Sequence, residues 1–332
     1  MREIAEHIGK SLDCGIDTVL VTVVQGRGST PRHGGSQMLI DAKGLACGTI
    51  GGGAVEAHGI KVASTLLGQR KARVEDLGLR KDLGMACGGG ATLLFTPICA
   101  NDEEWRAVAS ALLRCYSKRI DACLALRCVV GEEPFEGGVA LFDVNSALLA
   151  GHGGVDADSL GGLCESHNAG SWFVMPVSLP VRAIVFGGGH VGRATVEALA
   201  RVGFACTLYD NRPEFAVPER FPLAQEVICG SYQDIAASFA FDKRDFVLIM
   251  TSGHESDFAV LEQALRQPLA YVGMMGSRRK IATGRARMLE AGISEEAFDT
   301  VNAPIGLEIE AETPEEIAVS IAAECILRRA RG

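Results

Sequence analysis

The sequence lacks a long apolar run and lacks the spacings that mark a metal site. No stretch reaches the roughly 18 to 20 apolar residues that a membrane-spanning helix needs. The N-terminal segment is amphipathic and has no apolar core of the kind found in secretion signals. The 11 cysteines form no C-x-x-C pair and no His/Cys cluster at zinc spacing, which favours reduced, buried thiols. These absences predict a cytoplasmic protein with no membrane segment and no protein-ligated metal.

Positive charge is also in short supply. Lys and Arg number 32 against 41 Asp and Glu, which gives a formal net charge of −9. Nucleic-acid binders depend on cations that pair with phosphates, so this balance argues against a nucleic-acid partner. Any basic site must therefore be local. The 332 residues suffice for two domains with separate cores, and 40 glycines against 11 prolines indicate many tight turns.

The two halves of the sequence follow different patterns. From about residue 181 onward, apolar runs such as RAIVFGG, ACTLYD and DFVLIM alternate with helical segments, which is typical of parallel β-α-β units. The first half is less regular and has the mixed pattern of an α+β domain. The segment Met175–Arg182 contains two prolines and is the expected linker. We therefore predict an α/β protein, with an α+β domain at residues 1–178 and a Rossmann-like, doubly wound parallel sheet at residues 179–332.

A dinucleotide-type glycine fingerprint opens the second half. Gly187, Gly189 and Gly192 follow an apolar strand and lead into a helix, and Asp210 ends the next strand. In such a loop the glycines permit a tight turn, the approach of a phosphate and the packing of helix on strand. The acidic residue accepts hydrogen bonds from a ribose hydroxyl. The alternative is a Rossmann-like fold whose nucleotide site is vestigial.

Other polar residues follow strands in the same half. His190 stands at the helix front beside the fingerprint, and Arg212 could meet a second phosphate. His254 and Asp257 come after the strand FVLIM, at the end where open α/β sheets bind their ligands. His254 fits a proton donor or an anion contact, and it fits an ordinary turn residue equally well.

In the segment GMMGSRRK, cations occupy the front of a helix. Helix N-termini carry partial positive charge and favour Asp or Glu, yet here Arg278, Arg279 and Lys280 follow Ser277. The chain uses an ordinary capping box, Thr313-Pro314-Glu315-Glu316, at another helix start. Solvated cations on an exposed turn are one interpretation. We favour the other, in which a phosphate of a ligand in the Rossmann crevice occupies that helix front.

Three Gly-rich loops in the first half form a second group of candidates. The loop GRGSTPRHGG could form an anion-binding concavity or a plain hairpin, and GTIGGGAVE places glycines ahead of a helix, an arrangement that holds phosphate. Glu56 follows in the first turn, where it could simply complement the helix dipole. Cys87 in GMACGGG fits a ligand contact or a buried turn. The candidates in these loops are Ser29, Thr30, Arg32, Gly51, Gly52, Gly53, Glu56 and Cys87.

As a set, these motifs resemble the XdhC/CoxI family, the xanthine dehydrogenase accessory factors. The resemblance rests on GSTPRHGG, GTIGGGAVE and CGG in the first half, and on VFGGGHVGRA, YDNR, GHESD, YVGMMGSRRK and APIGLEI in the second. It covers most of the chain in order, with residues 100 to 175 least covered. Two positions depart from the family pattern: Ser252, where a His is common, and Glu310, which replaces a Gly.

The resemblance implies a homodimer that binds molybdenum cofactor, as molybdopterin or its dinucleotide form. It implies that a cysteine desulfurase delivers the terminal sulfido ligand and that the cofactor then passes to an apo-molybdenum hydroxylase. No turnover of its own is implied, so no catalytic residue is assigned. On this interpretation the Gly-rich and basic loops of both halves contact one anionic cofactor. An NAD(P)-dependent oxidoreductase is the alternative, and a docking scaffold without a cofactor is a third hypothesis.

Overall fold

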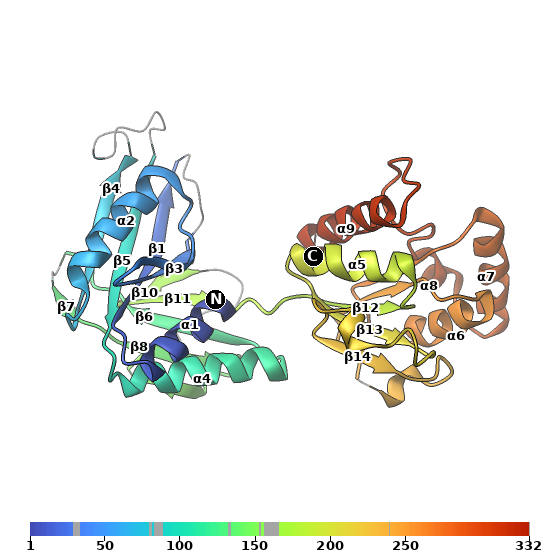
Figure 1. Ribbon diagram of the computed structural model, residues 1–332, viewed down its shortest axis with the longest axis horizontal. Coiled ribbons are helices and arrows are strands. Elements are labelled where there is room, and N and C mark those ends of the chain that lie inside the picture. The colour runs from blue at the N-terminus through green and yellow to red at the C-terminus, as the bar shows by residue number, and fades with distance from the viewer. Residues whose placement is uncertain are drawn as a thin grey trace. The chain divides into compact units, whose positions relative to one another are not determined.

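The computed structural model describes residues 1–28, 34–79, 82, 89–131, 134–152, 154–155, 166–238 and 240–331. The chain forms two compact units, Met1–Leu179 and Pro180–Gly332, which are taken one at a time below (Figure 1). Among the described residues, no helix is both long enough and apolar enough to cross a bilayer.

The first unit is built on two antiparallel sheets and three described helices. The strand orders are β3-β2-β1-β5-β4-β7 and β10-β11-β6-β8-β9. The strands are β1 (Thr18–Arg27), β2 (Gln37–Asp41), β3 (Gly44–Gly48), β4 (Lys71–Gly78), β5 (Gly90–Ile98), β6 (Ala122–Arg127), β7 (Phe135–Glu136), β8 (Val139–Asp143), β9 (Leu148–Gly151), β10 (His167–Ala169) and β11 (Trp172–Pro176). The helices are α1 (Arg2–Asp13), α2 (Gly53–Leu66) and α4 (Glu103–Lys118).

Alternation along the central strand β1 divides the core of the first unit into two layers. Val19 and Val21 pack in the same cluster as Val55 of α2. Leu20, which points to the opposite face, packs with Ile8 of α1 and with residues of α4. Because both faces of β1 are apolar, the strand is covered on each side and its ladder is shielded from water.

The second unit contains a five-stranded parallel sheet with helices on both faces. The strand order is β14-β13-β12-β15-β16. The strands are β12 (Arg182–Phe186), β13 (Ala205–Asp210), β14 (Glu226–Cys229), β15 (Phe246–Ile249) and β16 (Tyr271–Met274). The helices are α5 (His190–Arg201), α6 (His254–Leu265), α7 (Arg278–Glu290), α8 (Glu295–Asp299) and α9 (Pro314–Arg331).

Strand β12 shows how the sequence produces these layers. Ala183 and Val185 pack in a cluster with residues of α5 and α9, which lie side by side (Figure 1). Ile184 and Phe186 face the opposite cluster, which includes residues of α6, α7 and α8. A strand that is apolar on both faces is typical of a parallel sheet, as the sequence predicts.

The predicted fold class is confirmed: an α+β part precedes a Rossmann-type parallel sheet. The capping box at α9 is confirmed as well, since the Glu316 carboxylate accepts the Thr313 N–H at 2.9 Å and the Thr313 hydroxyl accepts the Glu316 N–H at 3.2 Å. The predicted linker begins too early. Met175 and Pro176 belong to β11 and pair with β6, and β10 ends opposite Val174, so no neighbour on that side requires the missing N–H of Pro176.

Candidate functional site

All five parallel strands of the second unit end at one edge of the sheet, and the loops at this edge carry most of the predicted site residues. Gly187 follows β12, Asp210 ends β13, Thr251 comes after β15 and Ser277 comes after β16. Strands β13 and β15 lie on either side of β12, so successive connections leave in opposite directions from this point. Open α/β sheets bind ligands in the crevice at such a switch point.

The glycine fingerprint has the backbone geometry that its sequence predicts. Gly187 has a φ of 119°, and a Cβ there would lie 2.3 Å from the Met250 carbonyl oxygen. A Cβ at Gly192 would lie 1.8 Å from the Gly187 carbonyl oxygen, so α5 could not pack against the loop. A Cβ at Gly189 would meet no atom within 4 Å. The middle glycine therefore borders open space, where a ligand atom can approach the backbone.

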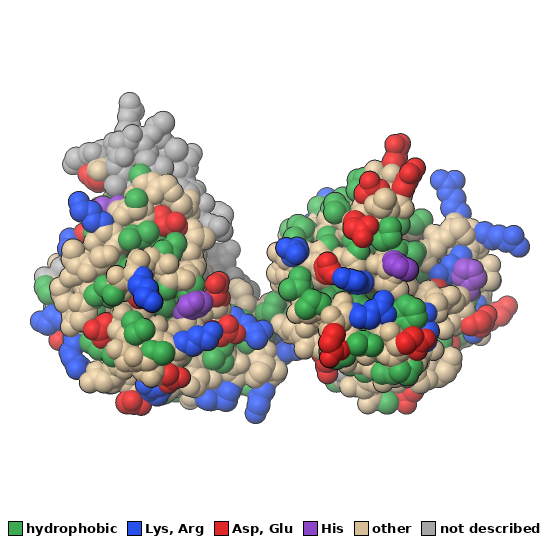
Figure 2. Space-filling model, viewed as in Figure 1, with side chains coloured by type: hydrophobic (Ala, Val, Ile, Leu, Met, Phe, Trp, Pro, Cys, Tyr) green, Lys and Arg blue, Asp and Glu red, His purple; other side chains and the backbone are tan. Residues whose placement is uncertain are grey.

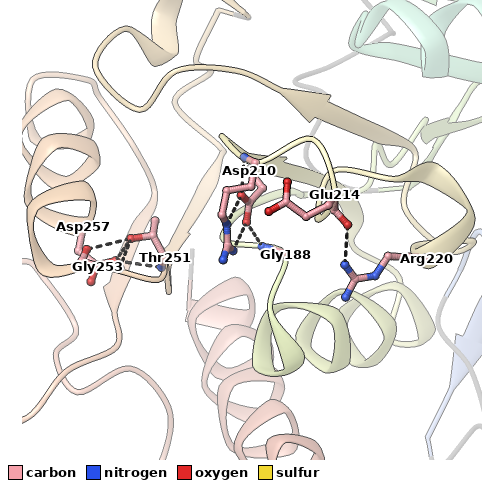
Figure 3. A network of polar contacts seen from close by, with 8 residues as sticks. Gly188, Asp210, Glu214, Arg220, Thr251, Gly253 and Asp257 are labelled. Atoms are coloured by element: carbon pink, nitrogen blue, oxygen red, sulfur yellow. Dashed lines mark hydrogen bonds and ion pairs between the residues drawn. The ribbon is translucent and has the colours of Figure 1, made fainter.

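Asp210 is fully buried and its carboxylate already accepts four hydrogen bonds (Figure 3). The donors are the Gly188 N–H at 2.7 Å and three groups of Arg212, namely its N–H and Nε at 2.9 Å each and Nη2 at 2.8 Å. The Arg212 guanidinium also stacks on the Phe215 ring at 3.7 Å. Burial pushes the pKa of Asp210 upward, but the hydrogen bonds from Arg212 and Gly188 outweigh burial and hold the pKa below the ordinary 3.8.

These bonds correct two predictions. A carboxylate has about four acceptor positions, and Arg212 and Gly188 fill those of Asp210. A ribose hydroxyl could reach Asp210 only by displacing Arg212. Arg212 in turn is committed to Asp210 and Phe215, so it is not a free cation waiting for a second phosphate.

A second buried network surrounds Asp257, in the first turn of α6 (Figure 3). One carboxylate oxygen accepts the Thr251 N–H at 2.9 Å and the Thr251 hydroxyl at 2.8 Å. The other forms an ion pair with Lys280, which also donates to the Met275 carbonyl at 2.6 Å. The side chains of Asp257 and Lys280 are 2% and 8% exposed. Lys280 thus ties the front of α7 to the front of α6, which corrects its prediction as a ligand contact.

The other two cations at the front of α7 are in a different situation. Arg278 and Arg279 are exposed and pair with no residue in the part of the chain that the structure describes. Ser277 caps the helix by accepting the Lys280 N–H at 3.3 Å. Figure 2 shows basic side chains projecting into solvent over the region of α7. Two unpaired cations beside a positive helix end repel it, and a bound anion would reverse that repulsion.

The two predicted histidines of the second unit are both exposed. His190 lines a groove of about 450 Å³ between α5 and α9, together with Arg193, whose guanidinium pairs with Glu197 at 3.2 Å. His254 stands at the first position of α6 and has no side-chain hydrogen bond to any described residue. Neither histidine is fixed by the protein in an orientation that would serve proton transfer.

In the first unit, the Gly-rich turn ahead of α2 holds an anion of its own. Gly51, Gly52 and Gly53 all have positive φ, at 123°, 74° and 60°. One oxygen of the Glu56 carboxylate accepts the Thr49 hydroxyl at 2.6 Å, the Gly52 N–H at 3.2 Å and the Ile50 N–H at 3.3 Å. A phosphate would have to displace this carboxylate, so the predicted phosphate site is corrected to a turn closed by Glu56.

Four predicted contacts, Ser29, Thr30, Arg32 and Cys87, lie outside the described residues. The expected convergence of loops from both halves on one ligand stays a prediction. Among the described residues, no group of three or more His, Cys, Asp or Glu side chains could hold a metal ion.

Sequence reasoning missed two residues at the edge of the parallel sheet. Thr251 orients Asp257 through both its N–H and its hydroxyl. Tyr232, three residues after the end of β14, is 3% exposed and its hydroxyl has no hydrogen-bond partner among the described residues. Each could have been found by examining the loop after every predicted strand, because these loops meet at one edge.

Comparison with known proteins places this geometry in a family. The sequence model of the XdhC Rossmann domain matches residues 183–325, and that of the XdhC and CoxI family matches residues 12–78. A protein from Bacillus subtilis, named as a probable component of xanthine dehydrogenase, is 28% identical over 95% of this chain and 94% of its own length. The molybdenum cofactor insertion chaperone PaoD from Escherichia coli is 24% identical over 97% of this chain and 87% of its own.

Two further comparisons extend over nearly the whole chain. The protein YqeB of Escherichia coli is 29% identical over 92% of this chain, which spans 42% of that protein's length. The crystal structure described as a xanthine dehydrogenase from Bacillus halodurans is 25% identical and covers 100% of this chain and 96% of its own, with a TM-score of 0.83. With its Rossmann crevice and its two matched segments in the same order, the chain belongs to the XdhC and CoxI family.

Proposed function

We propose that this chain binds molybdenum cofactor as cargo in the Rossmann crevice of its second unit and passes it to an apo-molybdenum hydroxylase. In this proposal a cysteine desulfurase adds the terminal sulfido ligand while the cofactor is held. Relatives named as a molybdenum cofactor insertion chaperone and as a probable component of xanthine dehydrogenase support a maturation role. The proposal concerns binding and transfer, and it assigns no turnover to the chain.

The observation that carries the proposal is the unpaired couple Arg278 and Arg279 at the front of α7, two cations without a partner among the described residues. Molybdenum cofactor is a pterin dithiolene that ends in a phosphate or a dinucleotide pyrophosphate. Guanidinium groups and the free N–H groups of a helix front are suitable donors for such an anion. Room for the rest of the cargo exists beside Gly189 and Gly253, where a Cβ would meet no atom within 4 Å.

The metal end of the cargo makes few demands on the protein. The dithiolene sulfurs already chelate molybdenum, so no set of side-chain ligands is required. This fits the described residues, which offer no cluster able to hold a bare ion. The crevice therefore has to recognise the phosphate and the pterin.

The NAD(P)-dependent alternative would use the same glycine fingerprint. It requires an acceptor for the ribose hydroxyls, and Asp210 is the residue at that position. Arg212 and Gly188 occupy its carboxylate, which disfavours a ribose there. Direct titration with NADH tests this alternative.

The test is co-expression with the cofactor pathway, followed by measurement of pterin fluorescence and molybdenum per purified chain. The double variant Arg278→Ala/Arg279→Ala should retain at least tenfold less pterin, about 1.4 kcal/mol or more, because both free cations are lost. The matched control is Arg285→Ala/Arg287→Ala. It removes the same charge from the same helix, but Arg285 pairs with Glu295 and Arg287 pairs with Glu255.

Three outcomes would count against the proposal. Equal loss of pterin in both double variants would point to net charge and not to a phosphate site. NADH binding by a wild-type protein that retains no pterin and no molybdenum would favour the oxidoreductase. Partner binding with neither signal would favour a docking scaffold.

A further inference from the structure

Tyr232 is fixed at the edge of the parallel sheet by neighbouring aromatic rings. It follows β14, the strand that pairs with β13. Its ring centroid lies 5.9 Å from that of Tyr209 and 6.4 Å from that of Phe186, in an edge-on arrangement with the latter. Because the side chain is only 3% exposed and packed in this cluster, its hydroxyl cannot turn out to solvent.

Two buried tyrosines of the same cluster differ in their hydrogen bonding. The Tyr209 hydroxyl donates to the Ser231 carbonyl at 2.9 Å. The Tyr232 hydroxyl has no partner in the described part of the chain, and the Asn211 N–H faces it outside hydrogen-bonding geometry. Buried polar groups are almost always paired, so an unpaired phenol at a ligand-binding edge calls for a partner that arrives with the ligand.

The electrostatic surroundings define what that partner can be. Burial and the nearby carboxylates of Asp210 and Asp257 raise the pKa of Tyr232, so the phenol stays protonated and acts as a donor. Both carboxylates are already engaged, Asp210 by Arg212 and Asp257 by Thr251 and Lys280. The same two negative charges would repel a phosphate at this point. A neutral acceptor, such as a ring carbonyl or ring nitrogen, meets both conditions.

We propose that the Tyr232 hydroxyl is a specificity contact that donates a hydrogen bond to a neutral acceptor on the heterocycle of the bound ligand. The inference rests on the proposed function, in which the heterocycle is the pterin of the cargo. It assigns the two ends of that cargo: the pterin lies toward Tyr232, and the phosphate lies at Arg278 and Arg279.

The experiment compares Tyr232→Phe with Tyr209→Phe, which removes a hydroxyl from the same aromatic cluster. Unfolding of each cargo-free protein is followed by circular dichroism, and pterin retention is measured after co-expression. Tyr232→Phe should leave the unfolding equilibrium unchanged or shifted toward the folded state, and should lower pterin retention about 5- to 100-fold. Tyr209→Phe should shift the unfolding equilibrium several-fold toward the unfolded state and leave retention unchanged.

The outcomes separate this inference from the function on which it rests. If the wild-type protein retains no pterin, the proposed function fails, and the pterin contact fails with it. If the wild type retains pterin and Tyr232→Phe retains as much, only the role of Tyr232 is overturned. A Tyr232→Phe variant as destabilised as Tyr209→Phe would show that the hydroxyl is already paired inside the protein, which also overturns it.

Discussion

Neighbouring cations at the front of α7 should respond to substitution in opposite ways. Replacing Lys280 by Ala leaves the Asp257 carboxylate, 2% exposed, without its cation, and it leaves the Met275 carbonyl without a donor. Breaking a buried ion pair by removing one partner costs about 3–5 kcal/mol. Thr251 still donates two hydrogen bonds to Asp257, so we expect a loss near the lower end, about 3 kcal/mol. Arg279→Ala breaks no contact among the described residues and should change the free energy of unfolding by less than about 0.5 kcal/mol.

Urea denaturation followed by circular dichroism measures this difference. A loss of about 3 kcal/mol corresponds to a shift in midpoint of about 1 M or more for a typical slope. Trp105 and Trp172, the two tryptophans of the sequence, both lie in the first unit. Their fluorescence transition should therefore stay in place and serve as an internal control for Lys280→Ala.

A double variant decides whether the ion pair is the cause. Asp257→Asn/Lys280→Met removes both charges and should recover most of the stability lost in Lys280→Ala. The reasoning is refuted if Lys280→Ala unfolds at the wild-type midpoint, or if the double variant is less stable than both single variants together predict.

Two other predictions test the corrected sites. Glu56→Gln should destabilise the first unit by about 1–3 kcal/mol, because the three groups that donate to its carboxylate lose a charged acceptor; tryptophan fluorescence during urea unfolding measures this, and an unchanged midpoint would mean that water replaces the carboxylate at no cost. Asp210 has a pKa held below 3.8, so its stabilising contribution is present above that pH and is lost as the pH falls through the lowered value. The wild-type free energy of unfolding should consequently fall more steeply between about pH 4 and pH 2 than that of Asp210→Asn, and parallel curves would contradict the assignment.

Several features could be predicted from the sequence because they depend on neighbours in the chain. The alternation in β12, the glycines of the fingerprint and the capping box of α9 each act within a few residues. Glu310, noted as standing where the family has Gly, has a φ of 56°, a left-handed conformation that glycine adopts more easily. Backbone geometry of this kind leaves a local trace in the residue types.

Charged side chains were harder to interpret, since their partners come from other elements. Asp257 and Lys280 are 23 residues apart and meet because β15 and β16 are neighbours in the sheet, which brings the fronts of α6 and α7 together. The closure of the Gly51 to Gly53 turn by Glu56 is a nearer case, because a glutamate in the first turn of the helix is only four residues from Gly52. There the sequence offered the correct acceptor, and the structure shows that it occupies the turn itself.

By itself, the sequence determined the order of the elements, the Rossmann-type sheet with helices on both faces and the place where its loops must gather. It also marked residues 278–280 as an unusual helix start. Only the tertiary structure separated Lys280, which is buried against Asp257, from Arg278 and Arg279, which remain exposed and unpaired among the described residues. The physical reason is that hydrophobic periodicity and backbone preference are encoded over a few residues, whereas the effect of a charge depends on which groups lie within about 4 Å of it and how much water is excluded.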